Sequence, residues 1–375
     1  MARTSLRIVA LAGYRSYNND FAQNQIELKN VNIIIGANGA GKSNLISFLE
    51  MVSFMMTRGL RSYVARQGGP QSLLYFGAKQ TEKIQGKLVI ADDDGDKEDI
   101  YSFCLEKSAS DQLFFSEERM SYQDRWHQMP FEREFGVGHF EARLADDWEA
   151  TAKTLRSYLG QLKVFHFNDT SINSRIRSST NVTDGGYLRS DGGNMAAFLY
   201  RMRENQDEVP YYERIVRYIR MVLPQFYDFV LEPDTNGRLL LNWRQSGSEE
   251  IFGPHQLSDG ALRFVALTTL LLQPSGTAPM TIILDEPEIG LHPMAISLLA
   301  KEIRMASKTS QIIVSTQSPL LLDQFSCEDI VTADYDPAHQ CSVLRRHKKS
   351  DLREWLKEYT LGELWEKNVL GGMPL

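Results

Sequence analysis

Hydrophobic positions divide the chain into segments with two different periodicities. Short continuous apolar runs are typical of strands buried on both faces, and they occur at 6–11, 31–35, 280–284 and 312–314. Apolar residues at spacings of three and four indicate amphipathic helices, and they follow at 45–52, 257–272 and 293–303. The return of this strand and helix pattern at both ends of the chain predicts an α/β fold.

The middle of the chain has a different pattern. Three strand candidates separated by polar turns suggest antiparallel hairpins, namely Lys87–Ala91, Tyr101–Leu105 and Leu113–Phe115. Residues 166–193 are polar and contain glycine, which indicates a loop. Helices are then expected at Asn194–Arg203, Tyr211–Val222 and, near the end, Trp355–Trp365, and a hairpin of Phe229–Pro233 and Leu239–Trp243 around Asn236-Gly237.

Composition narrows the class of protein. The chain has 375 residues, of which 42% are hydrophobic and 24% charged, as in a globular protein with a large core. Its apolar runs are much shorter than the about 20 residues of a membrane span, and the first residues lack the apolar core of a signal peptide. The net charge of −7 argues against a general nucleic-acid binder. Three widely spaced cysteines argue against a disulfide framework and favour a cytoplasmic location.

Residues 36–43, Gly-Ala-Asn-Gly-Ala-Gly-Lys-Ser, match the phosphate-binding pattern GxxxxGK[ST] between a buried strand and a helix. Glycines allow the backbone N–H groups to surround a phosphate, and the helix N-terminus adds partial positive charge. Lys42 would contact the β- and γ-phosphates of ATP, and Ser43 would bind Mg²⁺. The predicted nucleotide-binding residues of this loop are Gly36, Asn38, Gly39, Gly41, Lys42 and Ser43.

Two further motifs fit the same chemistry. The strand at 280–284 leads directly into Asp285 and Glu286, which we expect to hold Mg²⁺ and to polarise the attacking water, respectively. Taken alone, this pair could be an acidic strand end facing solvent. The segment Leu257-Ser258-Asp259-Gly260-Ala261 opens a helix. Ser258 could be an ordinary helix cap, but the glycine and the position before the acidic strand favour binding of a γ-phosphate by Ser258 and Gly260.

These motifs together resemble those of ABC-class ATPases. LSDGA is similar to their LSGGQ signature, with Asp259 at the third position and Ala261 in place of the final glutamine. The segment 288–293, Glu-Ile-Gly-Leu-His-Pro, resembles the D-loop of RecF-like and OLD-like members. The resemblance covers residues 1–56 and 255–335, and the chain is similar to bacterial AAA-type ATPases of the ABC class that lack both an SMC-type coiled coil and a TOPRIM domain.

The resemblance implies roles for further residues. Gln317 stands where the class usually has a switch histidine; it can hydrogen-bond a γ-phosphate but cannot become charged. Arg15 in the aromatic-Arg-Ser run matches a residue that contributes to the nucleotide site, although a surface turn explains it equally well. The Q-loop glutamine is Gln67 or Gln71, which the sequence does not separate.

The resemblance also implies an organisation of the chain. We expect an ABC-type P-loop ATPase core of residues 1–56 and 255–335, a β-rich lobe at 57–165, a helical and hairpin lobe at 166–254, and a helical tail at 336–375. In this class the signature helix completes the phosphate site of a second chain, so a homodimer with two shared ATP sites is implied.

The expected function is ATP hydrolysis that gates a partner effector or a nucleic-acid transaction. Relatives suggest a nuclease-like or TOPRIM-like partner and a role in anti-phage defence, with DNA as another possible partner. The alternatives are a RecF-like DNA repair ATPase and a nucleotide-dependent scaffold with little turnover. The basic run at 345–349 could contact DNA, but a solvated surface explains it more simply.

Overall fold

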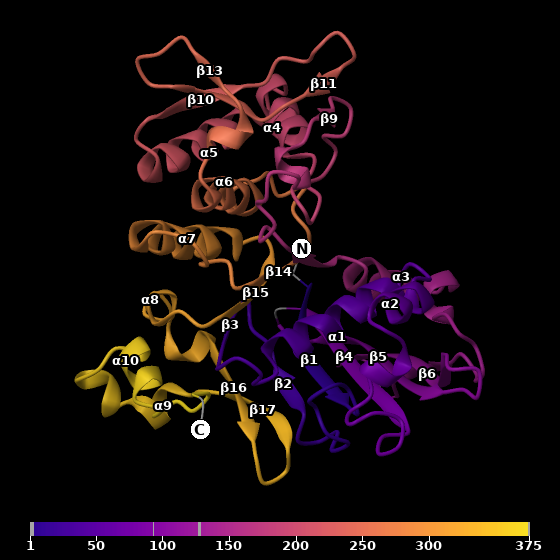
Figure 1. The fold of residues 1–375 in the computed structure, drawn as a ribbon. Helices are drawn as coiled ribbons and strands as arrows, with labels where there is room; N and C mark the ends of the chain where they lie inside the picture. Colours follow the sequence, from indigo (N-terminus) through magenta and orange to yellow (C-terminus); the bar gives the residue numbers. More distant parts are fainter. Residues whose placement is uncertain (1–3, 93, 127–128, 374–375) are drawn as a thin grey trace. The chain divides into compact units, whose positions relative to one another are not determined.

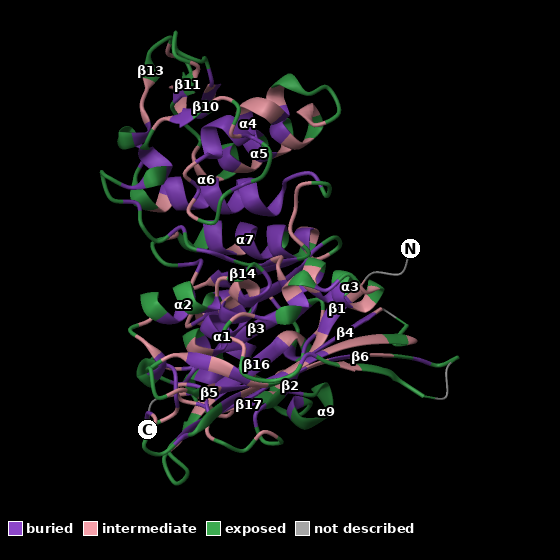
Figure 2. Ribbon diagram, turned by 90° about the vertical axis from the view of Figure 1, so that its right-hand side faces the viewer, coloured by how far each residue is buried: buried purple, intermediate pink, exposed green. Residues whose placement is uncertain are grey.

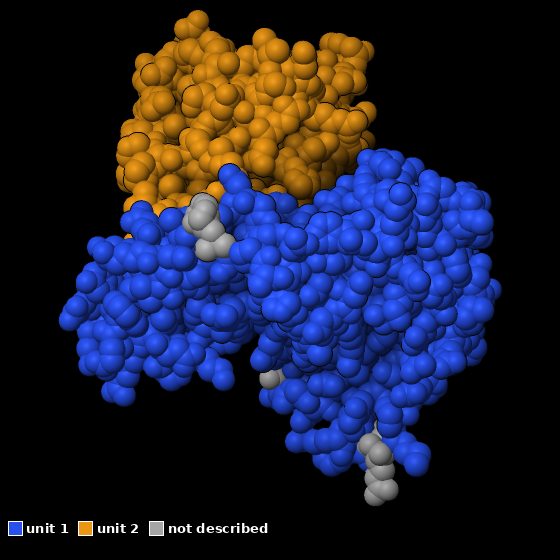
Figure 3. All heavy atoms as spheres, turned by 60° about the horizontal axis from the view of Figure 1, so that its bottom comes forward, with its two compact units in different colours: residues 1–163, 326–375 blue, residues 164–325 orange. Residues whose placement is uncertain are grey.

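The computed structural model describes residues 4–92, 94–126 and 129–373. The chain forms two compact units, which Figure 3 shows in different colours: residues 1–163 with 326–375, and residues 164–325. The strand β8 (Leu162–Phe165) crosses from the first unit into the second. No helix in the described part of the chain combines the length and the apolarity of a membrane span.

The first unit is built on a six-stranded antiparallel sheet with the order β2-β1-β4-β5-β6-β7. Its strands are β1 (Thr4–Ala12), β2 (Gln25–Glu27), β4 (Lys83–Asp92), β5 (Lys97–Lys107), β6 (Leu113–Asp124) and β7 (Phe131–Glu134). The expected antiparallel hairpins are confirmed, and β1 and β2 join them in the same sheet.

Three helices lie along this sheet, as Figure 1 shows: α1 (Lys42–Met55), α2 (Leu60–Arg66) and α3 (Ala150–Leu159). The ring of Phe48 on α1 stacks on Phe103 of β5 with centroids 6.1 Å apart. Burial of such large aromatic side chains stabilises the packing of a helix on a sheet. The buried residues of both layers are purple in Figure 2.

A second group of strands in the first unit positions the glycine-rich loop. The strand β3 (Val31–Ile35) has the bounds that the apolar run predicted, and all its residues are buried. It pairs in parallel with β16 (Ile330–Asp336), which pairs antiparallel with β17 (Cys341–Arg346). The short helices α9 (Lys349–Leu352) and α10 (Leu361–Glu366) follow.

The second unit has a parallel strand pair, β14 (Thr281–Asp285) and β15 (Gln311–Thr316), in register from Thr281↔Gln311 to Asp285↔Ser315. Its helices are α4 (Met195–Glu204), α5 (Val209–Val222), α6 (Asp259–Leu271), α7 (Pro293–Ala306) and α8 (Pro319–Leu322). Helix α6 is buried along its length from Ala261 to Leu271, because helices pack on it from more than one side.

The remaining strands of the second unit are short: β9 (Thr180–Asn181), β10 (Phe226–Val230), β11 (Arg238–Leu239), β12 (Asn242–Gln245) and β13 (Ile251–Phe252). The hairpin predicted around Asn236-Gly237 is partly wrong. Phe229 and Trp243 do pair, but Leu239 belongs to β11, which pairs with β9 from the predicted loop. This pairing is between distant segments, so the local pattern contained no sign of it.

The prediction of a helical tail needs correction. Residues 341–346 form the strand β17, and the helix expected over Trp355–Trp365 is divided into a 3₁₀ turn (Trp355–Lys357) and α10. Thr360 causes the division because its side chain accepts from the Glu363 N–H while the Glu363 carboxylate accepts from the Thr360 N–H, which starts a new helix.

The basic run at 345–349 is also not a uniformly solvated surface. The guanidinium of Arg346 donates to the backbone carbonyls of Glu27 and Glu328 at 2.9 and 2.8 Å, and His347 is buried against the hydroxyl of Thr332. Desolvation by burial lowers the pKa of both side chains. Two members of the run therefore hold the strands together.

Candidate nucleotide-binding site

The predicted site residues occur in both units. In the first unit, the loop after β3 is shaped by close backbone contacts. A Cβ at Gly36 would overlap the carbonyl oxygen of Ala333 on β16, and Gly41 has a left-handed φ of 105° beside the hydroxyl of Ser342. Only glycine fits these two positions, for a steric reason in each case.

Lys42 begins helix α1 and its side chain is 96% buried. Its ammonium group donates to the carbonyl of Gly36 at 2.6 Å and to that of Ala37 at 3.0 Å. The lysine therefore folds back over its own loop, while Asn38, Gly39 and Ser43 are exposed. The positive charge of Lys42 is therefore already at the loop where a phosphate would bind.

The aromatic-Arg-Ser run, residues 14–17, lies against this loop. The hydroxyl of Tyr17 donates to the Gly41 carbonyl at 3.0 Å, and the Asn44 amide donates to Ser16 Oγ at 2.7 Å. Both tyrosines of the run are fully buried, and burial raises the pKa of Tyr14 and Tyr17 above their usual range. The run thus fixes the position of the loop and of the first turn of α1.

Arg15 is brought next to the first turn of α1. Its guanidinium donates to Gln67 Oε1 at 2.6 Å and to Asn44 Oδ1 at 3.5 Å, and its backbone has a left-handed φ of 48°. A non-glycine residue held in this region carries strain, which proteins retain mainly at functional sites. Gln71 instead accepts from the backbone N–H of Ala78, within its own turn. Of the two glutamines, only Gln67 contacts Arg15.

In the second unit, the acidic strand end and the switch segment are joined by side-chain hydrogen bonds. The Ser315 hydroxyl donates to Asp285, and the Gln317 amide donates to Glu286 Oε1. The Glu286 N–H donates to the Ser315 carbonyl at 3.0 Å, and Glu286 has a left-handed φ of 47°. Because β14 and β15 are parallel neighbours, their carboxyl ends place these side chains together.

Glu288, which the motifs indicated only as the first residue of the D-loop segment, is part of the same group. It is 92% buried, and its Oε1 accepts from the Thr316 hydroxyl at 2.5 Å and from the Gln317 N–H at 3.2 Å. Its other oxygen is buried without a hydrogen-bond partner. Desolvation raises the pKa of this carboxyl. Glu288 therefore fixes the backbone from which Gln317 extends.

Ser258 is the N-cap of α6, and its exposed side chain accepts from the Ala261 N–H at 3.3 Å. The ordinary capping role is thus present in the structure. Gly260 packs against the turn of residues 288–291, because a Cβ there would overlap the carbonyl oxygen of Gly290. The glycine of the signature therefore allows the tip of α6 and the D-loop segment to lie in contact.

Two arginines that sequence reasoning missed support this tip. Arg177 is 6% exposed and donates to the carbonyls of Thr170, Pro254 and Leu257 and to Asp259 Oδ1. Arg263 donates to the carbonyls of Ile289, Asn168 and Phe167. No sequence motif surrounds Arg177, and Arg263 lies in the helix predicted over 257–272 without a motif of its own. Their partners are backbone carbonyls, which a sequence does not distinguish.

In the first unit, a strand, a glycine loop and a helix together hold a lysine. The second unit has an acidic strand end paired with a switch segment, and a signature helix capped by a serine. These features define the ABC type of P-loop ATPase.

The chain is similar to the SMC head bound to the C-winged helix domain of ScpA, with a TM-score of 0.58, 15% identity, and coverage of 93% of this chain and 99% of that chain. It is similar to the SMC head domain with an extended coiled coil bound to the C-terminal domain of ScpA derived from Pyrococcus furiosus, with a TM-score of 0.57, 14% identity, and coverage of 95% and 99%.

These likenesses concern the fold, which is the α/β fold of ABC-type ATPase heads with an antiparallel β lobe. Residues 31–323 match the family described as "AAA domain, putative AbiEii toxin, Type IV TA system", and the chain belongs to this family. A search among curated proteins finds no match. The predicted family resemblance and fold class are therefore confirmed.

The residues present fit MgATP. The loop of residues 36–43 has a buried lysine and a helix N-terminus that begins at Lys42, and Ser43 is exposed at that terminus. Mg²⁺ commonly takes one or two protein oxygens and completes its shell with phosphate oxygens and water. The hydroxyl of Ser43 in the first unit is a ligand of this kind, and the second unit separately offers a carboxylate at Asp285.

Proposed function

We propose that this protein binds and hydrolyses MgATP as an ABC-class homodimer. The observation that carries the proposal is the hydrogen bond between Gln317 and Glu286, next to Asp285 at the ends of two parallel strands. It brings a carboxylate suited to polarise water together with an amide suited to contact a γ-phosphate. Lys42 and the loop amides would hold the phosphates.

When bound, Mg²⁺ would neutralise charge on the β- and γ-phosphates, and Ser43 and Asp285 would hold it. Arg15 and Gln67 would act at the nucleotide as a pair, with Gln67 as the Q-loop residue, since Arg15 lies beside the first turn of α1. Glu286 would accept a proton from the attacking water, and Gln317 would orient the γ-phosphate.

The exposed tip of α6, with Ser258 and Gly260, would complete the site of a second copy. ATP would then favour the closed dimer because its γ-phosphate is bound from both sides, and hydrolysis would open it. We assign the ATPase core to residues 1–56 and 255–335, with the remaining segments forming lobes that respond to this cycle.

The cycle would gate a partner, for which a nuclease-like or TOPRIM-like protein acting in anti-phage defence is our proposal, with DNA as a further ligand. The family's description as a toxin of a type IV TA system supports a search for such a partner. Three free, buried cysteines are compatible with the cytoplasmic location that we propose with it.

The decisive experiment compares wild type, Lys42→Ala and Glu286→Gln. We expect ATP turnover by wild type alone, and an ATP-dependent dimer by light scattering that Glu286→Gln prolongs because water is no longer activated. A Glu286→Gln protein that stays monomeric with saturating ATP would contradict the shared-site proposal. Turnover that is unchanged in Lys42→Ala would contradict the assigned site.

The second candidate function is a nucleotide-dependent scaffold with little turnover. The same hydrogen bond favours it. The Gln317 amide occupies the carboxylate oxygen Oε1 of Glu286, which would otherwise be open to the attacking water, and an amide cannot itself accept a proton from that water. ATP-dependent dimerisation with turnover below about 3 × 10⁻⁴ s⁻¹, roughly one per hour, would support the scaffold, because a typical enzyme turns over at about 10 s⁻¹. Strong stimulation by DNA would favour a RecF-like repair role.

A further inference from the structure

A segment near residue 372 lies against the start of the glycine-rich loop. The carbonyl of Gly372 accepts a hydrogen bond from the backbone N–H of Ala37, with a nitrogen–oxygen distance of 2.6 Å. Ala37 is the second residue of the phosphate-binding pattern. The contact therefore joins the loop to residues 370–373, which we name the carboxy-terminal turn.

Two consecutive glycines make this close approach possible. Gly371 and Gly372 have left-handed φ values of 79° and 80°. A Cβ at Gly372 would lie 2.7 Å from Thr332 Cγ2, 2.9 Å from the Ala333 carbonyl oxygen and 3.2 Å from the Cα of Gly36. Both the backbone conformation and the space exclude a side chain at this position. The carboxy-terminal turn is thus built to lie on β16 beside the loop.

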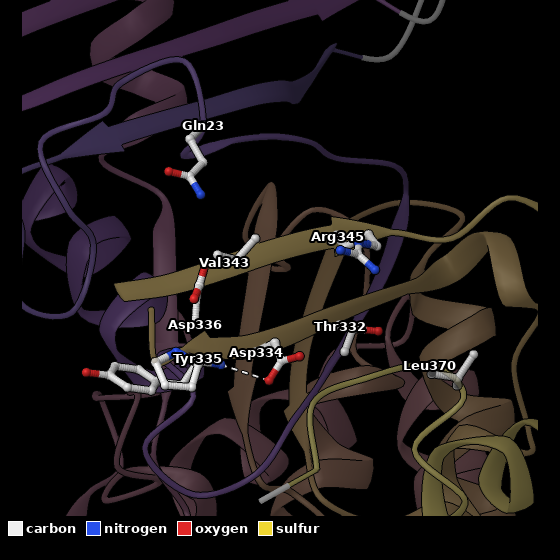
Figure 4. A pocket seen from close by; sticks show the side chains of 9 residues that line it. Gln23, Thr332, Asp334, Tyr335, Asp336, Val343, Arg345 and Leu370 are labelled. Atoms are coloured by element: carbon white, nitrogen blue, oxygen red, sulfur yellow. Dashed lines mark hydrogen bonds between the residues drawn. The ribbon is translucent and has the colours of Figure 1, made fainter. Parts of the chain in front are cut away.

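The fold holds the turn in place. Leu370 is 98% buried, the Val369 N–H donates to the Leu364 carbonyl at 2.9 Å, and the Met373 N–H donates to Asn368 Oδ1 at 3.4 Å. Leu370 lines a cavity of about 400 Å³ together with Thr332 and Asp334 of β16. Figure 4 shows Leu370 at the end of this cavity where Thr332 lies. These contacts anchor the turn independently of the loop.

The turn also shapes the outer side of the loop. Met373 lines a second cavity, of about 350 Å³, together with Asp334, Tyr335 and residues 37–40 of the loop. Asp334 and Tyr335 line both cavities, so β16 and the carboxy-terminal turn form one continuous surface against the loop. The start of the loop therefore contacts a segment that lies 335 residues further along the chain.

We propose that the carboxy-terminal turn is a positioning element for phosphate binding: Gly372 orients the Ala37 peptide and so holds the loop ready for nucleotide. This inference rests on the proposed function, because it concerns the affinity of that same site. A loop that is already held in its binding conformation loses less conformational entropy when the ligand binds. Loss of the tether should therefore weaken ATP binding while leaving the catalytic carboxylates untouched.

The test compares Gly372→Ala with the matched control Gly138→Ala. Gly138 also has a left-handed φ, 83°, but a Cβ there meets nothing within 4 Å, so the control carries the backbone strain without the contact. Hydrogen exchange of the Ala37 amide measures the tether directly, and ATP titration measures its consequence. We expect faster Ala37 exchange and about fivefold weaker ATP binding in Gly372→Ala only, with kcat unchanged at saturating ATP.

Equal Ala37 exchange in wild type and Gly372→Ala, or equal ATP affinity despite faster exchange, would overturn the inference. If wild type binds no ATP, the proposed function fails, while Ala37 exchange still reports on the tether. If Gly372→Ala does not fold, Asn368→Gly replaces it, since that change removes the side-chain acceptor of the Met373 N–H while glycine tolerates the left-handed φ of 56° at this position. The same two shifts, smaller in size, are then expected, and their absence would count against the tether.

Discussion

Replacing Arg177 by methionine should destabilise the second unit far more than removing the charge of its partner Asp259. The guanidinium of Arg177 is the common donor to three backbone carbonyls, those of Thr170, Pro254 and Leu257. Methionine keeps much of the apolar volume but donates nothing. The substitution therefore isolates the hydrogen bonds from the packing.

The magnitude follows from burial. Arg177 is 6% exposed, so its carbonyl partners lose a charged donor that water cannot easily replace, whereas Asp259 is 71% exposed and its ion pair is largely screened. Leaving such buried acceptors without their charged donor costs about 3–5 kcal/mol. Asp259→Asn should cost at most about 1 kcal/mol, since exposed ion pairs contribute little.

Native-state hydrogen exchange of the α6 amides measures this free energy locally. At about 1.4 kcal/mol per tenfold change, the Arg177→Met protein should exchange roughly a hundredfold or more faster, and Asp259→Asn at most about fivefold faster. Because the same contacts support the Ser258 tip, ATP-dependent dimerisation should weaken with Arg177→Met. An equal effect of the two substitutions would show that the ion pair dominates and refute the reasoning.

Three further outcomes are expected. Burial raises the pKa of Glu302 to about 8, so the folded state favours its neutral form, which is hydrogen-bonded to Thr268. The free energy of unfolding should therefore fall as the pH rises from about 4.5 to 8. Glu302→Gln should abolish this slope in urea titrations and be several kcal/mol more stable than wild type at pH 8. Glu288→Ala should lower kcat about tenfold or more with little change in KM, because Gln317 loses its support. Glu288→Gln retains an acceptor and should keep most of the wild-type kcat; an equal loss of kcat in both variants would point to a requirement for charge. Lys42→Ala should weaken ATP binding by a factor of about 10–100 by calorimetry, and undiminished affinity would contradict the assigned loop.

Local patterns were enough to predict much of the fold. The strand Val31–Ile35 has the predicted bounds, and the helices that begin at Lys42, Asp259 and Pro293 start at or within about two residues of the positions that glycine, serine and proline signals indicated. These features depend on side chains a few residues apart. Predictions were wrong where distant pairing decided the outcome, as at Leu239, which joins β9 instead of continuing toward Trp243.

The candidate site shows the same division. The loop residues and the pair Asp285 and Glu286 could be named from their motifs, because a phosphate-binding backbone needs glycine and a fixed local order. The choice between Gln67 and Gln71 could not be made, since both follow α1 at similar distances. Packing of α2 against α1 brings Gln67 to Arg15, and no local signal encodes that contact.

The amino-acid sequence alone determined the class of fold, the phosphate-binding loop and the order of the motifs, because each is set by interactions between near neighbours along the chain. The tertiary structure decided which polar group meets which. Arg177 with the carbonyls beneath the signature tip, Glu288 with the switch segment, and Gly372 with Ala37 are all contacts across more than 25 residues. Buried polar groups must find partners, and only the packing of the folded chain selects them.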